Sequence, residues 1–301
     1  MKTVRFKQVD VFSQRPFFGN PVAVVLEADG LGAADMQRIA AWTNLSETTF
    51  VLPPSDAKAD YRLRIFTPRA ELPFAGHPNV GTAFVLGSKG TYNGRTVSDA
   101  IFFEEKAGLV RLDLIKQGSA VVGARLAPPQ PVVRGDDIAV DIAAAAVSLA
   151  SSDIETAHHR PCFASCGIPM AFAELKTRAA LSAARPRADI FSEYLTADRA
   201  TGFLLYVEDR SGDFDLQARM FAPLFGVPED PATGSANVIL AGLLASLRPE
   251  ADLMLELRIG QGFDMGRPSS LAAVAEKRNG KVTGLSIGGR CVPMIRGALE
   301  I

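Results

Sequence analysis

The sequence contains 301 residues, which is room for about two domains of ordinary size and excludes a single small module. Hydrophobic residues make up 48% and charged residues 22%, and 32 Lys and Arg against 33 Asp and Glu leave a net charge of −1. This balance is typical of a globular protein and excludes recruitment of nucleic acid or an anionic membrane by bulk charge.

Residues 1–12 alternate apolar and polar side chains, as a half-buried strand does, and they lack the apolar core of a signal peptide. No apolar run approaches the ~18 residues that a membrane-spanning helix needs. The cysteines Cys162, Cys166 and Cys291 are too few, and odd in number, for a disulfide framework in a chain of this length. The sequence therefore predicts a cytoplasmic protein with no membrane partner.

Most of the predicted elements are short strands. In chain order, apolar runs between turn residues predict strands at 3–12, 21–26, 60–66, 100–105, 109–114, 202–207 and 214–220. Helical spacing predicts helices at 33–44, 78–87, 137–148, 191–198 and 235–247. The helices over 78–87 and 235–247 are apolar nearly all round, which indicates that each is buried inside its own sheet. The predicted fold is therefore a mixed α+β fold.

Three motifs occur twice, in the same order and at nearly the same spacing. They are G-x-P-x-A at 19–23 and 167–171, R-x-F-x-P at 64–68 and 219–223, and x-P-x-x-G-[S/T]-A at 77–83 and 230–236. Each match alone is weak, but the three together predict two similar halves. We expect the first half at 1–122, with a strand over 291–301 returning to it, and the second at 123–290. A Pro-rich connector is expected within 115–130.

The repeat also indicates where chemistry is expected. In both halves a proline lies near the start of the apolar helix, where free backbone N–H groups favour an anion. His77 and Asp230 precede these prolines, so two facing halves would bring an ionisable pair together across one cleft. The alternatives are that His77 is a satisfied helix-entry histidine and that Asp230 is an ordinary N-cap.

Glu47 is the third candidate. It precedes the apolar run 48–52 and so lies at the lip of a predicted strand, where partial burial would raise its pKa toward a value useful for proton transfer. The alternative is a solvated loop charge.

Several segments of the chain resemble those of a known family. The segments VDVFSQRPFFGNPVAVVLEADGL, NLSETTFVL, RIFTPRAELPFAGHPNVGTAF, EDPATGSAN and QGFDMGRPS are similar to those of the phenazine-biosynthesis PhzF-like isomerases, whose fold is that of diaminopimelate epimerase. The resemblance runs from residue 8 to about 290, and FAGHP and DPATGSA are its most specific parts. It implies two similar domains, each a curled, mostly antiparallel, barrel-like sheet around a central apolar helix, with the active site between them.

The resemblance also implies roles for particular residues. It makes Glu47 the general acid/base, with His77 and Asp230 as further catalytic residues. The implied substrate-binding residues are Asn20, Ser46, Gly76, Gly234 and Ser235. Asn79 stands where the family more often has threonine, a departure that affects the helix start and not the proton-handling groups.

The implied reaction is a cofactor-independent proton shift that moves a double bond on a small carboxylate-bearing metabolite. The substrate of the family's best-known member is trans-2,3-dihydro-3-hydroxyanthranilate. An epimerase or a hydro-lyase using the same cleft, and a binding clamp without turnover, are the alternatives. We expect no cofactor, a homodimer as the assembly, and no nucleic-acid or membrane partner.

Other chemistries have weaker support. His158, His159, Cys162 and Cys166 fall close together as metal ligands would, but 163–172 is typical of a buried strand and no paired C-x-x-C occurs, so we expect no metal site. Racemases of the resembling fold use a cysteine on each side of the cleft, and none of the three cysteines lies at the motifs above. Nucleotide-binding and nucleophile-elbow motifs are absent. The segment around Arg267 is predicted to be a hairpin, with a structural turn and a substrate contact as alternatives.

Overall fold

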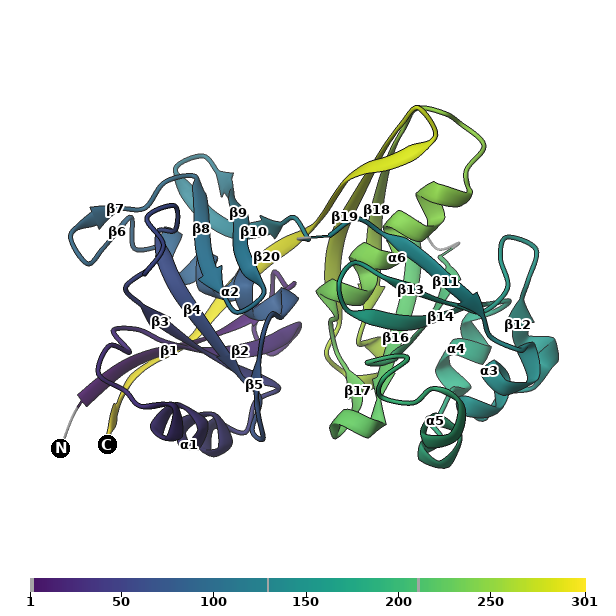
Figure 1. Ribbon diagram of the computed structural model, residues 1–301, viewed down its shortest axis with the longest axis horizontal. Helices are drawn as coiled ribbons and strands as arrows, with labels where there is room; N and C mark the ends of the chain where they lie inside the picture. Colours follow the sequence, from purple (N-terminus) through teal and green to yellow (C-terminus); the bar gives the residue numbers. More distant parts are fainter. Residues whose placement is uncertain (1–2, 129, 210–211) are drawn as a thin grey trace. The chain divides into compact units, whose positions relative to one another are not determined.

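The computed structural model describes residues 3–128, 130–209 and 212–301, and the chain divides into two units (Figure 1). The first unit comprises Met1–Pro129 and Gly288–Ile301, and the second comprises Gln130–Ile287. The last strand, β20 (Lys281–Glu300), contributes its beginning to the second unit and its remainder to the first.

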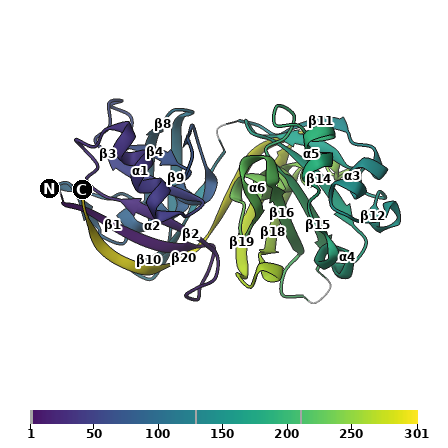
Figure 2. The same ribbon diagram turned by 90° about the horizontal axis from the view of Figure 1, so that it is seen from below.

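The strands of the first unit close into a barrel (Figures 1 and 2). Their bounds are β1 Thr3–Val11, β2 Asn20–Val25, β3 Glu47–Leu52, β4 Tyr61–Phe66, β8 Ala100–Glu105, β9 Gly108–Gln117 and β10 Ala120–Leu126. The neighbour order is β20, β1, β2, β3, β4, β8, β9, β10, and β10 pairs with β20 again. The β2–β3 and β4–β8 pairs are parallel, whereas β1–β2, β3–β4, β8–β9 and β9–β10 are antiparallel. The short β5 (Glu71–Leu72) extends β4, and β6 (Thr91–Tyr92) pairs with β7 (Arg95–Thr96).

Helix α2 (Gly76–Gly87) runs inside this barrel and contacts β1, β2, β3, β9 and β10. Its residues from Gly76 to Leu86 are all buried, as expected for a helix that is apolar on every side. A Cβ at Gly81 would lie 2.5 Å from Val22 Cγ1, so glycine there allows the helix to approach β2 closely. Helix α1 (Ala33–Thr43) instead packs one face on β3 and β4, with Met36 buried and Trp42 exposed.

The second unit repeats the strand pairing of the first. Its strands are β11 Val133–Asp137, β13 Cys162–Ser165, β14 Pro169–Leu175, β15 Phe203–Glu208, β16 Leu216–Ala222, β18 Leu253–Gln261 and β19 Ser269–Arg278, followed by the start of β20. The β14–β15 and β16–β18 pairs are parallel, and β11–β13, β13–β14, β15–β16 and β18–β19 are antiparallel. The short β12 (Ile154–Glu155) extends β14, and β17 (Val227–Asp230) extends β16. Helix α6 (Gly234–Leu247) contacts β13, β18 and β19, as α2 contacts its own strands (Figure 1).

Three short helices pack beside β14 and β15 and bury apolar side chains against them, which gives the second unit a further hydrophobic core. They are α3 (Val140–Ala146), α4 (Arg178–Ala183) and α5 (Ala188–Tyr194). Leu181 of α4 and Phe191 of α5 are buried there with Phe203 and Leu205 of β15. Single 3₁₀ turns lie at Ser151–Asp153, Pro223–Phe225 and Phe263–Met265.

The structure confirms the predicted α+β fold and its buried central helices. One local prediction is wrong: residues 163–172 do not form one strand, because Gly167 at φ +102° turns the chain between β13 and β14. The range 115–130 of the expected connector contains β10, and the first unit ends within it at Pro129, which lies outside the described residues. Within the described part of the chain, no helix combines the length and apolar character needed to cross a membrane.

Candidate active site

Glu47 lies at a junction between a helix and a strand in the first unit. Helix α1 ends at Thr43, and the left-handed backbone of the following Asn44 (φ 50°) turns the chain so that β3 can begin at Glu47, opposite Val22 of β2. The Glu47 side chain is only 18% exposed, and its Oε2 lies 3.5 Å from His77 Nε2. Burial raises the Glu47 pKa to about 7, although a hydrogen bond from Ser46 opposes the rise. The solvated-loop alternative does not fit this position.

His77 is the second residue of α2 and is 5% exposed. The helix begins after Ala75, which is extended and makes no side-chain cap hydrogen bond. His77 therefore lies in the first turn of α2, at the positive end of the helix dipole.

Asn20 and Ser46 complete the polar group of the first unit. The Ser46 hydroxyl donates to Asn20 Oδ1 at 3.2 Å, and Asn20 begins β2 with 1% exposure. The preceding Gly19 has φ +73°, and a Cβ there would lie 2.2 Å from the Val11 carbonyl oxygen, so only glycine fits. The first unit thus gathers five of the predicted site residues at the ends of β2, β3 and α2.

The remaining predicted residues lie in the second unit. Asp230 ends β17, is 9% exposed and accepts a hydrogen bond from the Thr233 hydroxyl. Gly234 and Ser235 are the first two residues of α6. Gln261 fixes this turn: its Nε2 donates to the Asp230 carbonyl at 2.7 Å, and its Oε1 accepts from the Thr233 N–H at 3.2 Å.

The structure corrects the predicted equivalence of His77 and Asp230. The residue before helix α6 is Thr233, so Asp230 is not its N-cap, whereas His77 lies within α2. Counted from the helix starts, His77 corresponds to Ser235. Asn79 and Asn237 confirm this register: each is the fourth residue of its helix and donates at 2.9 Å to the carbonyl of the residue that precedes the helix.

The repeated R-x-F-x-P motif has a structural role in both units. Arg64 makes two 2.7 Å hydrogen bonds to Glu71 and lies over the Phe66 ring. Arg219 bonds Glu229 in the same forked way, at 2.7 and 2.8 Å, and lies over Phe221. Such pairs position the strand that follows the motif.

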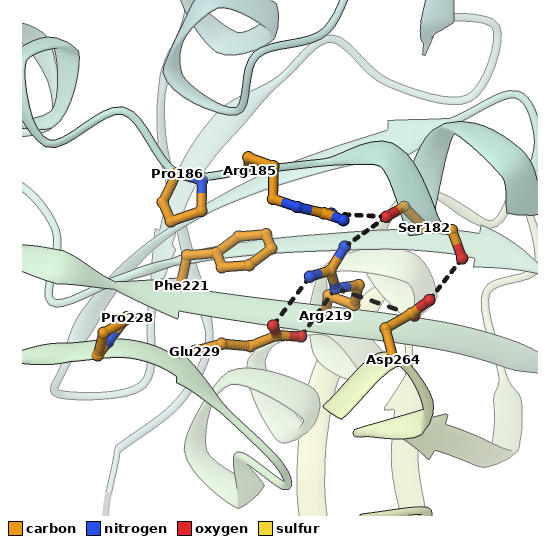
Figure 3. A pocket seen from close by; sticks show the side chains of 8 residues that line it. All are labelled: Ser182, Arg185, Pro186, Arg219, Phe221, Pro228, Glu229 and Asp264. Carbon is orange, nitrogen blue, oxygen red and sulfur yellow. Dashed lines mark hydrogen bonds and ion pairs between the residues drawn. The ribbon is translucent and has the colours of Figure 1, made fainter. Parts of the chain in front are cut away.

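A pocket of about 570 Å³ lies beside Arg219 (Figure 3). None of the site residues predicted from the sequence lines it. Arg219 uses its remaining nitrogen to donate to the carbonyl groups of Leu181, Ser182 and Ala184. Arg185 donates to the last two of these carbonyls. Both arginines are therefore engaged by the protein itself, and the pocket has no evident ligand-binding cation.

The alternative metal ligands have other partners. His158 Nδ1 lies 2.9 Å from a Glu174 oxygen, which also accepts from the Tyr206 hydroxyl. His159 Nε2 lies 2.7 Å from the same hydroxyl. Cys162 is buried, with its Sγ 4.0 Å from His159 Nδ1. The described residues contain no group of three or more His, Cys, Asp or Glu placed to hold a metal ion.

The hairpin around Arg267 is present, formed by β18, a 3₁₀ turn and β19. The Arg267 N–H donates to the Gly262 carbonyl, and Gly262 has φ +78°. Ser269 Oγ donates to the Pro231 carbonyl at 2.9 Å, so the hairpin supports the segment that precedes α6. These contacts favour a structural turn over a substrate contact as the role of this segment.

Sequence reasoning missed a buried carboxyl group. Glu105 ends β8 and is 8% exposed. Along this strand the buried residues alternate, as Ile101, Phe103 and Glu105. That period of two was the signal available in the sequence, because it places Glu105 on the apolar face.

Comparison with known proteins adds four findings. The family model described as "Phenazine biosynthesis-like protein" matches residues 9–297. Trans-2,3-dihydro-3-hydroxyanthranilate isomerase of Pseudomonas chlororaphis is 38% identical over 97% of this chain and 98% of its own. The crystal structure of a PhzF-family phenazine biosynthesis protein from Bacillus anthracis matches 100% of both chains with a TM-score of 0.87 and 25% identity. A hydroxyproline epimerase from Agrobacterium vitis, at 13% identity, TM-score 0.65 and coverage of 99% and 91%, has a similar fold.

Proposed function

This chain belongs to the phenazine biosynthesis-like protein family, and from that membership and the residues around Glu47 we propose that it moves a proton, and with it a double bond, on a small carboxylate-bearing substrate. The resemblance predicted from the motifs is confirmed, and the chain is an isomerase that acts on a small molecule. The proposed substrate is of the trans-2,3-dihydro-3-hydroxyanthranilate type, by analogy with the relative of that name.

The observation that carries the proposal is the buried contact between Glu47 and His77. A carboxyl group whose pKa lies at about 7 is present in both protonation states at neutral pH, so it can remove a proton and also return one. His77, 3.5 Å away, can orient this carboxyl group and share its charge. A surface glutamate of ordinary pKa would be a weaker acid catalyst by far.

The proposed reaction keeps all atoms balanced. The Glu47 carboxylate removes a proton from one substrate carbon, the electron pair of the broken C–H bond shifts the double bond, and the protonated Glu47 gives a proton to another carbon. The substrate is neither oxidised nor reduced. The helix-start N–H groups beside His77 stabilise negative charge that develops on the substrate.

The proposal assigns the other predicted residues to substrate binding and charge stabilisation. In the first unit these are Asn20, Ser46 and Gly76, which lie at strand and helix ends beside Glu47. In the second unit they are Asp230, as a further catalytic residue, with Gly234 and Ser235 at the start of α6. No step in this scheme requires a cofactor.

The test is turnover of trans-2,3-dihydro-3-hydroxyanthranilate by the wild type and by Glu47→Gln, followed by proton NMR. Glutamine keeps the shape and removes the base, so we expect a rate at least ~10² to 10⁴ times lower in a folded variant. Glu250→Gln, at an exposed glutamate, is the matched control and should leave the rate unchanged. A wild type that leaves this substrate unchanged would reject the substrate assignment. Inversion or elimination products would favour an epimerase or a hydro-lyase.

Two further expectations belong to the proposal. We propose a cytoplasmic location, supported by three cysteines that are all free and buried. We also propose a homodimer, which light scattering of the purified protein at micromolar concentration tests through its molar mass; the mass of a single chain would reject it.

A further inference from the structure

The strand register makes Glu105 of the first unit the counterpart of Gln261 of the second. In the first unit, Tyr61 of the R-x-F-x-P strand pairs with Phe103, two residues before Glu105. In the second unit, Leu216 at the same position of the motif strand pairs with Ile259, two residues before Gln261. Both residues end their strands, at the level where the central helix begins.

In the second unit this position carries a neutral amide whose oxygen and nitrogen both make hydrogen bonds. Gln261 Oε1 accepts from Asn237 Nδ2 at 2.7 Å as well as from the Thr233 N–H, and its Nε2 donates to the Asp230 carbonyl. Asn237 in turn donates to the Thr233 carbonyl. A side chain that both donates and accepts thus fixes the first turn of α6.

In the first unit the same position carries a carboxyl group with no cation beside it. The Glu105 side chain is buried, and among the residues that the structure describes neither of its oxygens has a hydrogen bond of normal geometry. The adjacent Lys106 donates to Glu71 at 2.7 Å, and Arg64 donates to the same carboxylate. The cations of neighbouring strands are therefore occupied elsewhere.

The Asn79 amide of α2 is a polar group within reach of Glu105. Burial raises the Glu105 pKa to about 8, and interaction with Asn79 only partly opposes this rise, so the group is mainly uncharged at neutral pH. An uncharged carboxyl group has an O–H donor and a carbonyl acceptor, so like an amide it can both donate and accept. Asn79 Oδ1 is itself buried without a partner in the described residues, so it can accept the O–H of Glu105.

We propose that Glu105 is a positioning residue for His77: as a neutral acid it binds the Asn79 amide from the position at which Gln261 accepts from Asn237, and so fixes the first turn of α2. Asn79 donates to the Ala75 carbonyl at 2.9 Å, and this bond spans the turn that contains His77. The position of the imidazole against Glu47 then depends on a residue that does not contact the substrate. The catalytic meaning of this inference rests on the proposed function, whereas its structural part does not.

The test compares Glu105→Gln, which places the amide of the second unit in the first, with Glu105→Met, which keeps the bulk and removes the hydrogen bonds. The first readout is the His77 imidazole spectrum by NMR, which needs no substrate. The chain has 3 histidines, so a His77→Gln spectrum assigns the signal. We expect Glu105→Gln to keep the wild-type His77 shifts and Glu105→Met to displace them.

The second readout separates kcat from KM. We expect Glu105→Gln to retain most of kcat and Glu105→Met to lose at least about tenfold in kcat, because His77 lies in the turn that is released. The change in KM should be smaller, because Asn20 and Ser46 bind each other and do not belong to this turn. Loss of kcat in both variants would overturn the proposal, since the ionised carboxylate would then be required. An unchanged His77 spectrum in Glu105→Met would also overturn it.

A variant of the partner residue covers the case in which Glu105→Met does not fold. Asn79→Ala and Glu105→Ala should each displace the His77 signal. In the double variant the second change should produce no further displacement, because the two residues act through one contact. Independent, additive displacements would contradict the proposal. If the wild type leaves the proposed substrate unchanged, only the proposed function fails, and the His77 spectra still decide the structural inference.

Discussion

The two units use the same framework to hold different polar groups. In each unit an arginine of the R-x-F-x-P strand makes two hydrogen bonds to a glutamate of the next strand. Each unit also has a buried helix whose fourth residue is an asparagine. Near the helix start, the second unit has the neutral Gln261 and the Asp230 carboxyl group, both with hydrogen-bond partners, whereas the first has the buried carboxyl groups of Glu47 and Glu105 with raised pKa values. The two units therefore share a framework and differ in the buried side chains that it holds.

The arginine pairs should differ in their contribution to stability. Arg219 is 5% exposed and also serves three carbonyl groups, whereas Arg64 is 18% exposed. Arg219→Met should therefore lower the free energy of unfolding by about 3–5 kcal/mol, because it leaves the half-buried Glu229 without its partner and three carbonyl groups without this donor. Arg64→Met should cost about 1–3 kcal/mol. Urea unfolding of both variants measures this, and an equal or larger loss for Arg64→Met would contradict the difference in burial.

The helix glycines offer a smaller contrast. A Cβ at Gly81 of α2 would approach Val22 to 2.5 Å, so Gly81→Ala should cost about 1–3 kcal/mol through overpacking. A Cβ at Gly242 of α6 would approach Val132 only to 3.0 Å, and alanine favours the helix by up to about 1 kcal/mol. Gly242→Ala should therefore stay within about 1 kcal/mol of the wild type. Thermal or urea unfolding checks both, and a more harmful change at Gly242 would show that α2 is not the more tightly enclosed helix.

Local sequence pattern predicted the elements well but not every register. The apolar spacing of 78–87 and 235–247 identified both central helices, because a helix that is apolar all round has few other places to lie. The shared proline motif wrongly aligned His77 with Asp230. Each unit pairs a short strand with its motif strand before the helix, β5 ending at Leu72 and β17 ending at Asp230, and in both units the helix begins four residues later. Asp230 therefore corresponds to Leu72, and this tertiary register is not encoded by a local proline motif.

Site residues were predictable to different degrees for similar reasons. Glu47 and His77 were identified from motif positions, and the structure places them in contact within one unit. Glu105 was missed because a glutamate at a strand end is usually solvated, and only its alternation with Ile101 and Phe103 shows that it faces inward. The pKa of either carboxyl group depends on burial by distant parts of the chain, which the local sequence does not report.

The raised Glu47 pKa has a consequence for stability. The ordinary value is 4.5 and the folded value about 7, so the protonated form favours the folded state, and stability falls as the pH rises from about 4.5 through about 7. Glu47→Gln removes the charge that is costly to bury. The variant should therefore be more stable than the wild type above pH 7, by an amount on the order of 3 kcal/mol, and similar to it at pH 4.

Direct titration of Glu47 tests the central claim, that this buried carboxyl group takes up and releases a proton near neutral pH. Carbon-13 NMR of the glutamate side-chain carboxyl groups, with Glu47→Gln used to assign the signal, gives its pKa without a substrate. We expect a Glu47 pKa of about 7. A value near the ordinary 4.5 would contradict it, because Glu47 would then be ionised at neutral pH and a poor proton donor.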